Sequence, residues 1–189
     1  MKKLILVASV SLLAACAAPQ PEQINLAPKA TLANSDLVSG STVNLTSKDV
    51  RAAQYVALVD SGRSNIEPLH PKQNVRISVE DAVAKQLQSQ GFDLTVNSEN
   101  SIIVEIQEAL VNVRHTVMKN EMDGKVTIQI TAETPQGKLV KTFTGTAKRE
   151  GSLSASNEEI ETVLNDVTNL VLKEIANDQE LNGYLKERF

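Results

Sequence analysis

The amino terminus of this 189-residue chain carries a basic start and an apolar run that ends at a cysteine. Lys2 and Lys3 precede residues 4–15, a run of 12 residues in which only Ser9 and Ser11 are not apolar. A helix needs about 20 apolar residues to cross the bilayer core, so this run is too short to span a membrane. Its length and basic start are typical of a secretory signal peptide. We therefore expect residues 1–15 to be removed on export.

The end of the run, Leu13-Ala14-Ala15-Cys16, matches the bacterial lipobox, in which a cysteine after small residues is lipidated and becomes the new amino terminus. This match predicts diacylglycerol and palmitate at Cys16, and two or three acyl chains hold a protein on a membrane essentially permanently. An ordinary secretory signal is the alternative, but it would leave an unpaired thiol in an oxidising compartment. Ala17 is not the Asp that resembles an inner-membrane retention signal, so we expect the periplasmic side of the outer membrane.

Composition excludes several kinds of partner. Cys16 is the only cysteine, which excludes a disulfide within the chain and a Cys-rich zinc site. Loss of Lys2 and Lys3 with the signal changes the formal net charge from −4 to −6, so no basic excess remains for nucleic acid. The chain has no Trp, two Tyr and three Phe, which argues against stacking platforms for bases or sugars. We expect neither a cofactor nor a nucleic-acid partner.

Residues 16–40 have the composition of a tether, because they contain Pro19, Pro21 and Pro28 among small and polar residues. Within them, Ile24-Asn25-Leu26 could instead dock as an edge strand. A flexible chain of about 25 residues has a root-mean-square reach of roughly 25–30 Å. The sequence thus predicts one periplasmic α+β domain, residues 41–189, standing off the bilayer.

Alternation of apolar and polar residues predicts strands at residues 43–46, 55–59, 92–96, 102–117, 126–133 and 139–148. Between residues 102 and 117 the apolar positions change from even to odd, which indicates a β-bulge near residues 108–110. Asp123-Gly124 predicts a turn, and so does Pro135-Gln136-Gly137. The segment 64–74, with Pro68 and Pro71, is expected to be a loop.

Two amphipathic helices are expected. The first follows a capping-box-like Ser78-Val79-Glu80-Asp81 and stops at Gly91, and the second begins at Ser156 and runs to about residue 175. Short turns between the last three strands predict an antiparallel meander with one wet side. The expected fold is therefore α+β, a two-layer sandwich of an antiparallel meander sheet with both helices packed on one face.

The order of these landmarks resembles the YajG-like family of outer-membrane lipoproteins. The resemblance rests on the lipobox, Ile24-Asn25-Leu26-Ala27-Pro28, Asp49-Val50-Arg51, Gln90-Gly91-Phe92 and the long strands before the last helix. It implies a periplasmic domain without known catalytic residues.

Few residues point to chemistry. His70 and His115 are the only histidines, and nothing in their spacing links them, so two surface histidines are favoured over a metal site. No nucleophile motif or phosphate-binding glycine pattern is present. Asp49 and Arg51 would share one face of an extended strand, where an ion pair that fixes the connection to Tyr55 is favoured over ligand contact.

Three functions stay open at this point. The preferred one is a non-catalytic envelope lipoprotein whose domain binds another protein or a cell-wall component. The alternative is a periplasmic hydrolase acting on a cell-wall component, which requires a cleft that joins Asp49, His70, His115 or acidic side chains. Carriage of a small hydrophobic ligand between sheet and helices would require a sizeable internal cavity.

Overall fold

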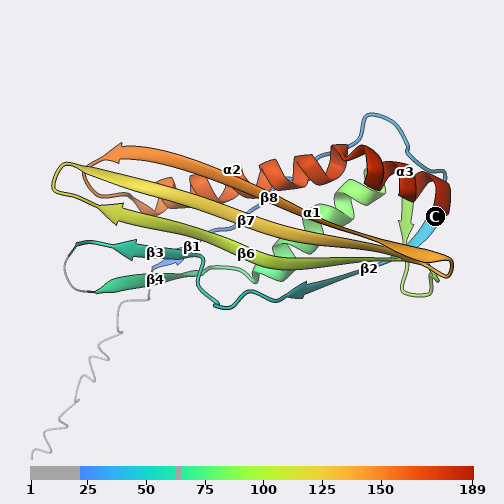
Figure 1. The fold of residues 1–189 in the computed structure, drawn as a ribbon, viewed down its shortest axis with the longest axis horizontal. Helices are drawn as coiled ribbons and strands as arrows, with labels where there is room; N and C mark the ends of the chain where they lie inside the picture. Colours follow the sequence, from blue (N-terminus) through green and yellow to red (C-terminus); the bar gives the residue numbers. More distant parts are fainter. Residues whose placement is uncertain (1–21, 63–64) are drawn as a thin grey trace, which may run out of the picture.

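Three long strands run the length of the molecule: β6 (Ser101–His115), β7 (Lys119–Thr134) and β8 (Gly137–Ser152). They pair antiparallel in sequence order, as expected from the short turns between them (Figure 1). The structure is a computed structural model that describes residues 22–62 and 65–189. The predicted signal peptide, Cys16 and Ala17 lie outside the described residues.

The edge of β6 that faces away from β7 pairs with two further strands, and both run parallel to β6. β2 (Ser41–Asp49) pairs with the first half of β6, and β3 (Ala57–Asp60) pairs with the second half. The outer strands are β5 (Phe92–Leu94), parallel to β2; β4 (Ile66–Pro71), antiparallel to β3; and β1 (Gln23–Ile24), parallel to β4. Four of the seven pairings between described strands are therefore parallel.

The predicted two-layer sandwich of antiparallel meander strands is wrong. The sheet is mixed, curls into a half-barrel, and carries three helices (Figure 1). A parallel pair needs a long crossover connection, and α1 (Val75–Ser89) lies within the one between β2 and β5. The prediction failed because alternation identifies strands without identifying their neighbours.

A β-bulge divides β6 at the place where its two partners change. The register of β6 against β7 shifts between Ile106 and Glu108, next to the predicted residues 108–110. Before the shift the buried residues are even-numbered, as in Val104, and after it they are odd-numbered, as in Val111. The bulge keeps both halves of the strand facing the core although the chain changes its alternation.

All three helices pack against one face of the sheet. α2 (Asn157–Asn177) begins at the predicted Ser156, whose capping box with Glu159 is formed. α1 begins earlier than predicted, because Asn74 rather than Ser78 caps it by accepting a hydrogen bond from the Ile77 N–H. α3 (Gln179–Arg188), capped by Asp178, was not predicted.

Two glycines let α2 lie unusually close to the sheet. A Cβ on Gly124 would lie 2.8 Å from Val163 Cγ1, and one on Gly145 would lie 2.7 Å from Val171 Cγ2.

The predicted turn at Asp123-Gly124 is wrong, because both residues lie inside β7. The actual hairpin turn is at residues 116–119, where the Thr116 N–H donates to the Lys119 carbonyl at 2.8 Å.

The predicted loop at residues 64–74 contains β4, despite Pro68 and Pro71. Proline removes a backbone donor and is tolerated mainly in edge strands. β1 pairs with β4 only at His70 and Pro71, so the rest of β4 has a partner on one side only. This edge position makes the prolines compatible with the strand.

Residues 22–33 of the predicted tether pack on the domain as an N-terminal strap. Ile24 and Leu26 are fully buried, so the docking that the sequence left open is found. The strap is fixed along α2 by three hydrogen bonds: Asn25 N–H to Glu161, Ala27 N–H to Asn165 and Lys29 N–H to Asn169, at 2.7–2.8 Å. Every second residue of an extended chain advances about 6.7 Å, and every fourth residue of a helix advances about 6 Å. The spacing of the donors on the strap therefore nearly equals the spacing of the acceptors on α2.

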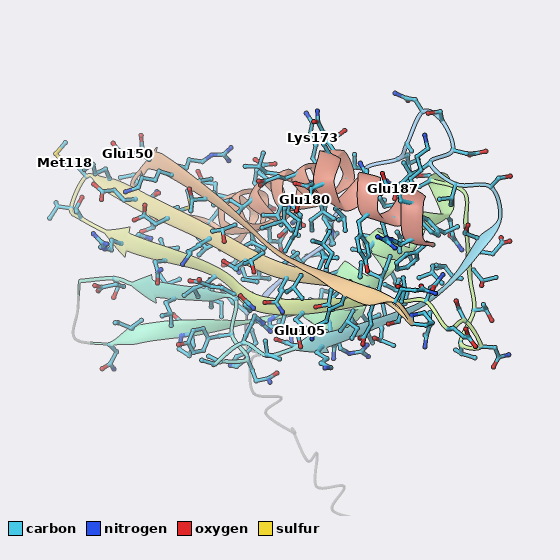
Figure 2. All side chains as sticks on the ribbon, turned by 45° about the vertical axis from the view of Figure 1, so that its right-hand side comes forward. Glu105, Met118, Glu150, Lys173, Glu180 and Glu187 are labelled. Carbon is cyan, nitrogen blue, oxygen red and sulfur yellow. The ribbon has the colours of Figure 1, made fainter. Side chains whose placement is uncertain are left out.

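The outer face of the sheet is polar. Lys48 pairs with Glu105 and Lys125 with Glu108 across neighbouring strands, and Figure 2 shows Glu105 on this side. Among the described helices, none combines the length and the apolar content that a membrane crossing requires.

Candidate functional site

Asp49 and Arg51 form the ion pair that their positions predicted. Arg51 Nε and NH2 each donate to a different carboxylate oxygen of Asp49 at 2.9 Å, and NH1 donates to the Tyr55 carbonyl at 3.1 Å. The Arg51 side chain is only 5 % exposed. The bidentate pair therefore ties the end of β2 to the connection that leads into β3.

The electrostatics of the pair favour the ionised form of Asp49. Burial of the Asp49 carboxylate opposes its ionisation, but the hydrogen bonds and charge of Arg51 outweigh burial, so the pKa of Asp49 lies below its ordinary value. A hollow of about 230 Å³ beside the β-bulge is lined by Arg51, Tyr55 and Leu110, among others. Because the known contacts of Arg51 hold the chain itself, ligand binding by Asp49 and Arg51 stays a prediction.

The two histidines lie on different strands. His115 Nε2 accepts a hydrogen bond from the Ala155 N–H at 3.1 Å, which fixes the segment just before the cap of α2. His70 lies on β4, which is separated from β6 by β3, and it lies about level with Leu110, five residues before His115 on β6. The strand spacing and the rise per residue therefore put the two histidines roughly 20 Å apart. Within residues 22–62 and 65–189, no cluster of three or more His, Cys, Asp or Glu side chains could hold a metal ion.

The space between the sheet and the helices is filled. Where α1, α2 and α3 meet the sheet, the remaining hollow is about 10 Å³, lined by residues such as Val83 and Ile130. That volume corresponds to about one water-sized sphere. It is too small for a hydrophobic ligand between sheet and helices.

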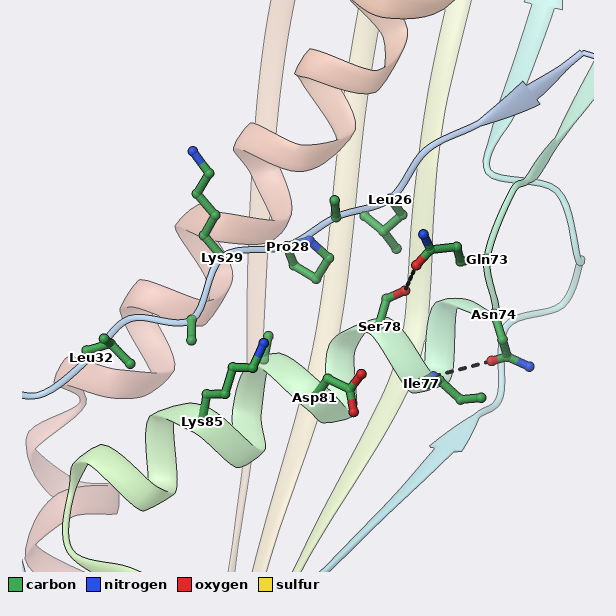
Figure 3. A pocket seen from close by; sticks show the side chains of 13 residues that line it. Leu26, Pro28, Lys29, Leu32, Gln73, Asn74, Ile77, Ser78, Asp81 and Lys85 are labelled. Carbon is green, nitrogen blue, oxygen red and sulfur yellow. Dashed lines mark hydrogen bonds between the residues drawn. The ribbon is translucent and has the colours of Figure 1, made fainter.

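A larger surface groove of about 660 Å³ lies between the strap and α1 (Figure 3). Buried Leu26 and Ala82 form part of its floor, and the large apolar side chains of Leu32 and Ile77 are exposed on the strap and on the first turn of α1. Its rim carries the charged residues Lys29, Asp81 and Lys85. The groove is therefore apolar inside and charged at its edge, as binding clefts commonly are.

Sequence reasoning missed this groove because it treated one wall as a tether. The opposite wall, α1, was expected to be a helix, but its predicted start at Ser78 left the first residues of α1, Ile77 among them, outside the predicted helix. Two signals were present in the sequence: the alternation of Ile24 and Leu26, and the acceptors Glu161, Asn165 and Asn169 at four-residue intervals on α2. Only the three-dimensional contact between them shows that the strap is a fixed wall.

Residues 28–186 match a family model described as uncharacterized lipoprotein. The uncharacterized lipoprotein YajG of Escherichia coli K12 is 25% identical over 178 residues, which cover 93% of this chain and 92% of that protein.

Two crystal structures share the fold. Protein XCC0632 from Xanthomonas campestris has a TM-score of 0.59 at 12% identity, with 87% of this chain and 97% of that chain covered. A second uncharacterized protein has a TM-score of 0.52 at 9% identity, with 83% of this chain and 99% of that chain covered. At such low identity these structures support the fold alone.

Proposed function

This chain belongs to a family of uncharacterized lipoproteins, and from that premise we propose that it is anchored through Cys16 and binds a protein partner in the groove between strap and α1. Family membership implies a membrane-anchored protein of the cell envelope. The finer proposal is that the lipid is on Cys16, that the membrane is the outer membrane, and that the domain faces the periplasm.

The anchor proposal is supported by the lipobox and by the residue that follows it. Cys16→Ser should release the protein from membranes and should abolish the mass that the acyl chains add to the mature protein. Ala17→Asp should leave the lipid in place and move the protein to the inner-membrane fraction. Membrane association that is unchanged in Cys16→Ser would contradict the anchor, and an outer-membrane location that is unchanged in Ala17→Asp would contradict the sorting rule.

The binding proposal is carried by one observation, the exposed Leu32 and Ile77 on two fixed walls of an apolar groove. The strap is held by hydrogen bonds to α2, so little conformational entropy has to be lost when a partner binds. Lys29 and Lys85 outnumber Asp81 on the rim. The expected partner is therefore a protein segment with apolar side chains for the floor and a carboxylate for the rim.

In-cell photo-crosslinking tests this proposal. A photoreactive residue at Ile77 should capture one discrete protein, whereas the same residue at Val140, an exposed apolar position on β8, should not. Leu32→Asp should weaken the adduct from Ile77, because it places a charge on the opposite wall, and Lys85→Glu should weaken it by reversing the rim charge. Identical capture from positions 77 and 140 would contradict binding in the groove. So would an adduct from position 77 whose yield is unchanged by both Leu32→Asp and Lys85→Glu.

The hydrolase alternative is not the function that the geometry favours. It requires histidines and carboxylates that meet in one cleft, and the strand register keeps His70 and His115 apart. His115 is also engaged by the Ala155 backbone.

A further inference from the structure

Three large apolar side chains are exposed together at one end of the sheet. Val117 and Met118, in the turn between β6 and β7, are 96% and 81% exposed, and Leu153, just after β8, is 71% exposed. The Leu153 N–H donates to the Met118 carbonyl at 3.3 Å, so the two segments are joined. Figure 2 shows Met118 at the extreme end of the molecule. We call these three residues the apolar tip.

The apolar tip is held in place rather than left loose. The buried Asn120 donates its side-chain N–H to the Leu153 carbonyl at 3.1 Å. Leu153 itself has φ 62°, in the left-handed region that residues with a side chain rarely adopt. Such strain persists only where surrounding contacts hold it, and it is often associated with function.

The charged side chains next to the apolar tip are one lysine and two glutamates, and they form no basic patch. Lys119 pairs with Glu121 at 2.8 Å and lies 3.6 Å from Glu150. A partner that recognises this end would therefore use its apolar side chains more than its net charge.

The strand register shows that the chain enters the domain from the side of the apolar tip. β1 is parallel to β4, and Ile66 of β4 lies level with Asp60 and Arg114 near the tip end. Residue 22 therefore lies on the tip side of β1. Leu69 lies level with Ala57, and Ala57 lies level with Val111. Gln23 pairs with His70, the residue after Leu69, so Gln23 lies close to the level of Leu110.

The length of chain between Cys16 and the domain now limits where the membrane lies. Gln23 is seven positions after Cys16, and seven residue steps can span at most about 23–25 Å. Seven residues of β6 and its turn also separate the level of Leu110 from Val117, or about 23 Å along the strand. The lipid and the apolar tip can therefore reach the same level.

The opposite end of the molecule does not satisfy this limit. It lies beyond Ser101, at least nine residues of β6 from the level of Leu110, or about 30 Å. To bring that end to the membrane, the seven-residue connection would have to reverse direction and exceed its full length. Of the two ends of the sheet, only the tip end lies within reach of a lipid at Cys16.

We propose that the apolar tip inserts into the lipid bilayer that holds the anchor, so that the protein contacts the membrane at two points. This inference rests on the proposed lipid at Cys16. A second apolar contact fixes the orientation of the domain and leaves the groove between strap and α1 facing the periplasm. Because the apolar side chains provide the attraction, insertion should change little with salt concentration.

The absence of Trp from the chain makes a clean test possible. Val117→Trp places a single fluorophore in the apolar tip. Val96→Trp places one at another highly exposed valine, 82% exposed, in the loop after β5 at the opposite end. The mature, lipidated form of each variant is reconstituted into vesicles of phosphatidylethanolamine and phosphatidylglycerol, with and without brominated acyl chains. Circular dichroism confirms that each variant is folded.

The Trp at position 117 should emit at shorter wavelength and lose intensity by about twofold or more to the brominated lipid, at low and high salt alike. The Trp at position 96 should stay unquenched. If the vesicles carry the protein and position 117 is quenched no more than position 96, the tip inference is wrong while the anchor stands. If position 117 responds only when envelope proteins are added, a protein rather than lipid covers the apolar tip, and the inference is again wrong.

Failure of the anchor itself has a different signature. If the anchor proposal is wrong, the Cys16→Ser variant will float with the vesicles to the same extent as the unsubstituted protein. The unsubstituted mature protein will also lack the mass that acyl chains would add. Flotation and mass are measured on the same samples as the fluorescence, so the two failures are distinguished.

Discussion

Replacement of Arg51 by Met tests whether the pair with Asp49 stabilises the fold. Met keeps much of the apolar volume of the arginine stem but removes the charge and three hydrogen bonds, two to Asp49 and one to the Tyr55 carbonyl. Removal of one partner of a buried ion pair costs about 3–5 kcal/mol, because the other charge is left without a partner. The Asp49 side chain keeps 20% exposure, so we expect the lower end, about 3 kcal/mol.

The assay is urea unfolding and thermal unfolding at neutral pH, combined with a double-mutant cycle. For a domain of this size a loss of about 3 kcal/mol lowers Tm by roughly 6–12 °C. The double variant Asp49→Leu with Arg51→Met removes both charges, so it should regain most of the stability lost in Arg51→Met. A loss below about 1 kcal/mol in Arg51→Met, the range of exposed ion pairs, would refute the structural role.

The pH dependence of the same pair gives an independent check. The pKa of folded Asp49 lies below its usual value of 3.8, because Arg51 outweighs the effect of burial. The pair therefore contributes its full stability above pH 3.8 and loses it as the pH falls through the folded pKa. The stability difference between the unsubstituted chain and Arg51→Met should narrow over that acidic range, and a constant difference would contradict the assignment.

Substitutions at three further positions test the packing and the cap of α2. Gly145→Ala places a Cβ 2.7 Å from Val171 Cγ2, and the overpacking should cost about 1–3 kcal/mol; an unchanged urea midpoint would mean that α2 is not held so close. Leu26→Ala should cost about 3–5 kcal/mol and speed hydrogen exchange in the strap, whereas a tether would give almost no change. Ser156→Ala should cost about 1 kcal/mol by thermal unfolding, and Ser156→Asp should retain most of the cap.

Local patterns were read correctly where the local physics decides the outcome. The capping box at Ser156 depends on residues three apart, and it formed as expected. The bulge in β6 was found next to its predicted position, because a change from even to odd burial must be absorbed within one strand. The Asp49 and Arg51 pair also follows from two residues on one face of the chain.

Features that depend on distant partners were not read correctly. Gly124 looked like a turn residue, but its missing side chain makes room for Val163, about 40 positions further along the chain. Pro68 looked like a loop residue, but it is compatible with β4 because that strand lies near the edge of the sheet. The strap looked like a tether, because the acceptors on α2 that fix it lie about 135–140 residues away.

By itself the sequence determined that this chain has an apolar amino-terminal run too short to cross a membrane, a lone cysteine at its end, strands with one apolar face, and an amphipathic helix near the carboxyl terminus. These are properties of side-chain order within a few residues. The tertiary structure decided that β2 and β3 share one edge of β6, that the strap forms a wall of the groove, and that Val117, Met118 and Leu153 meet at one end. Those outcomes depend on which distant surfaces bury one another best, and the residue pattern within one segment does not specify its partner.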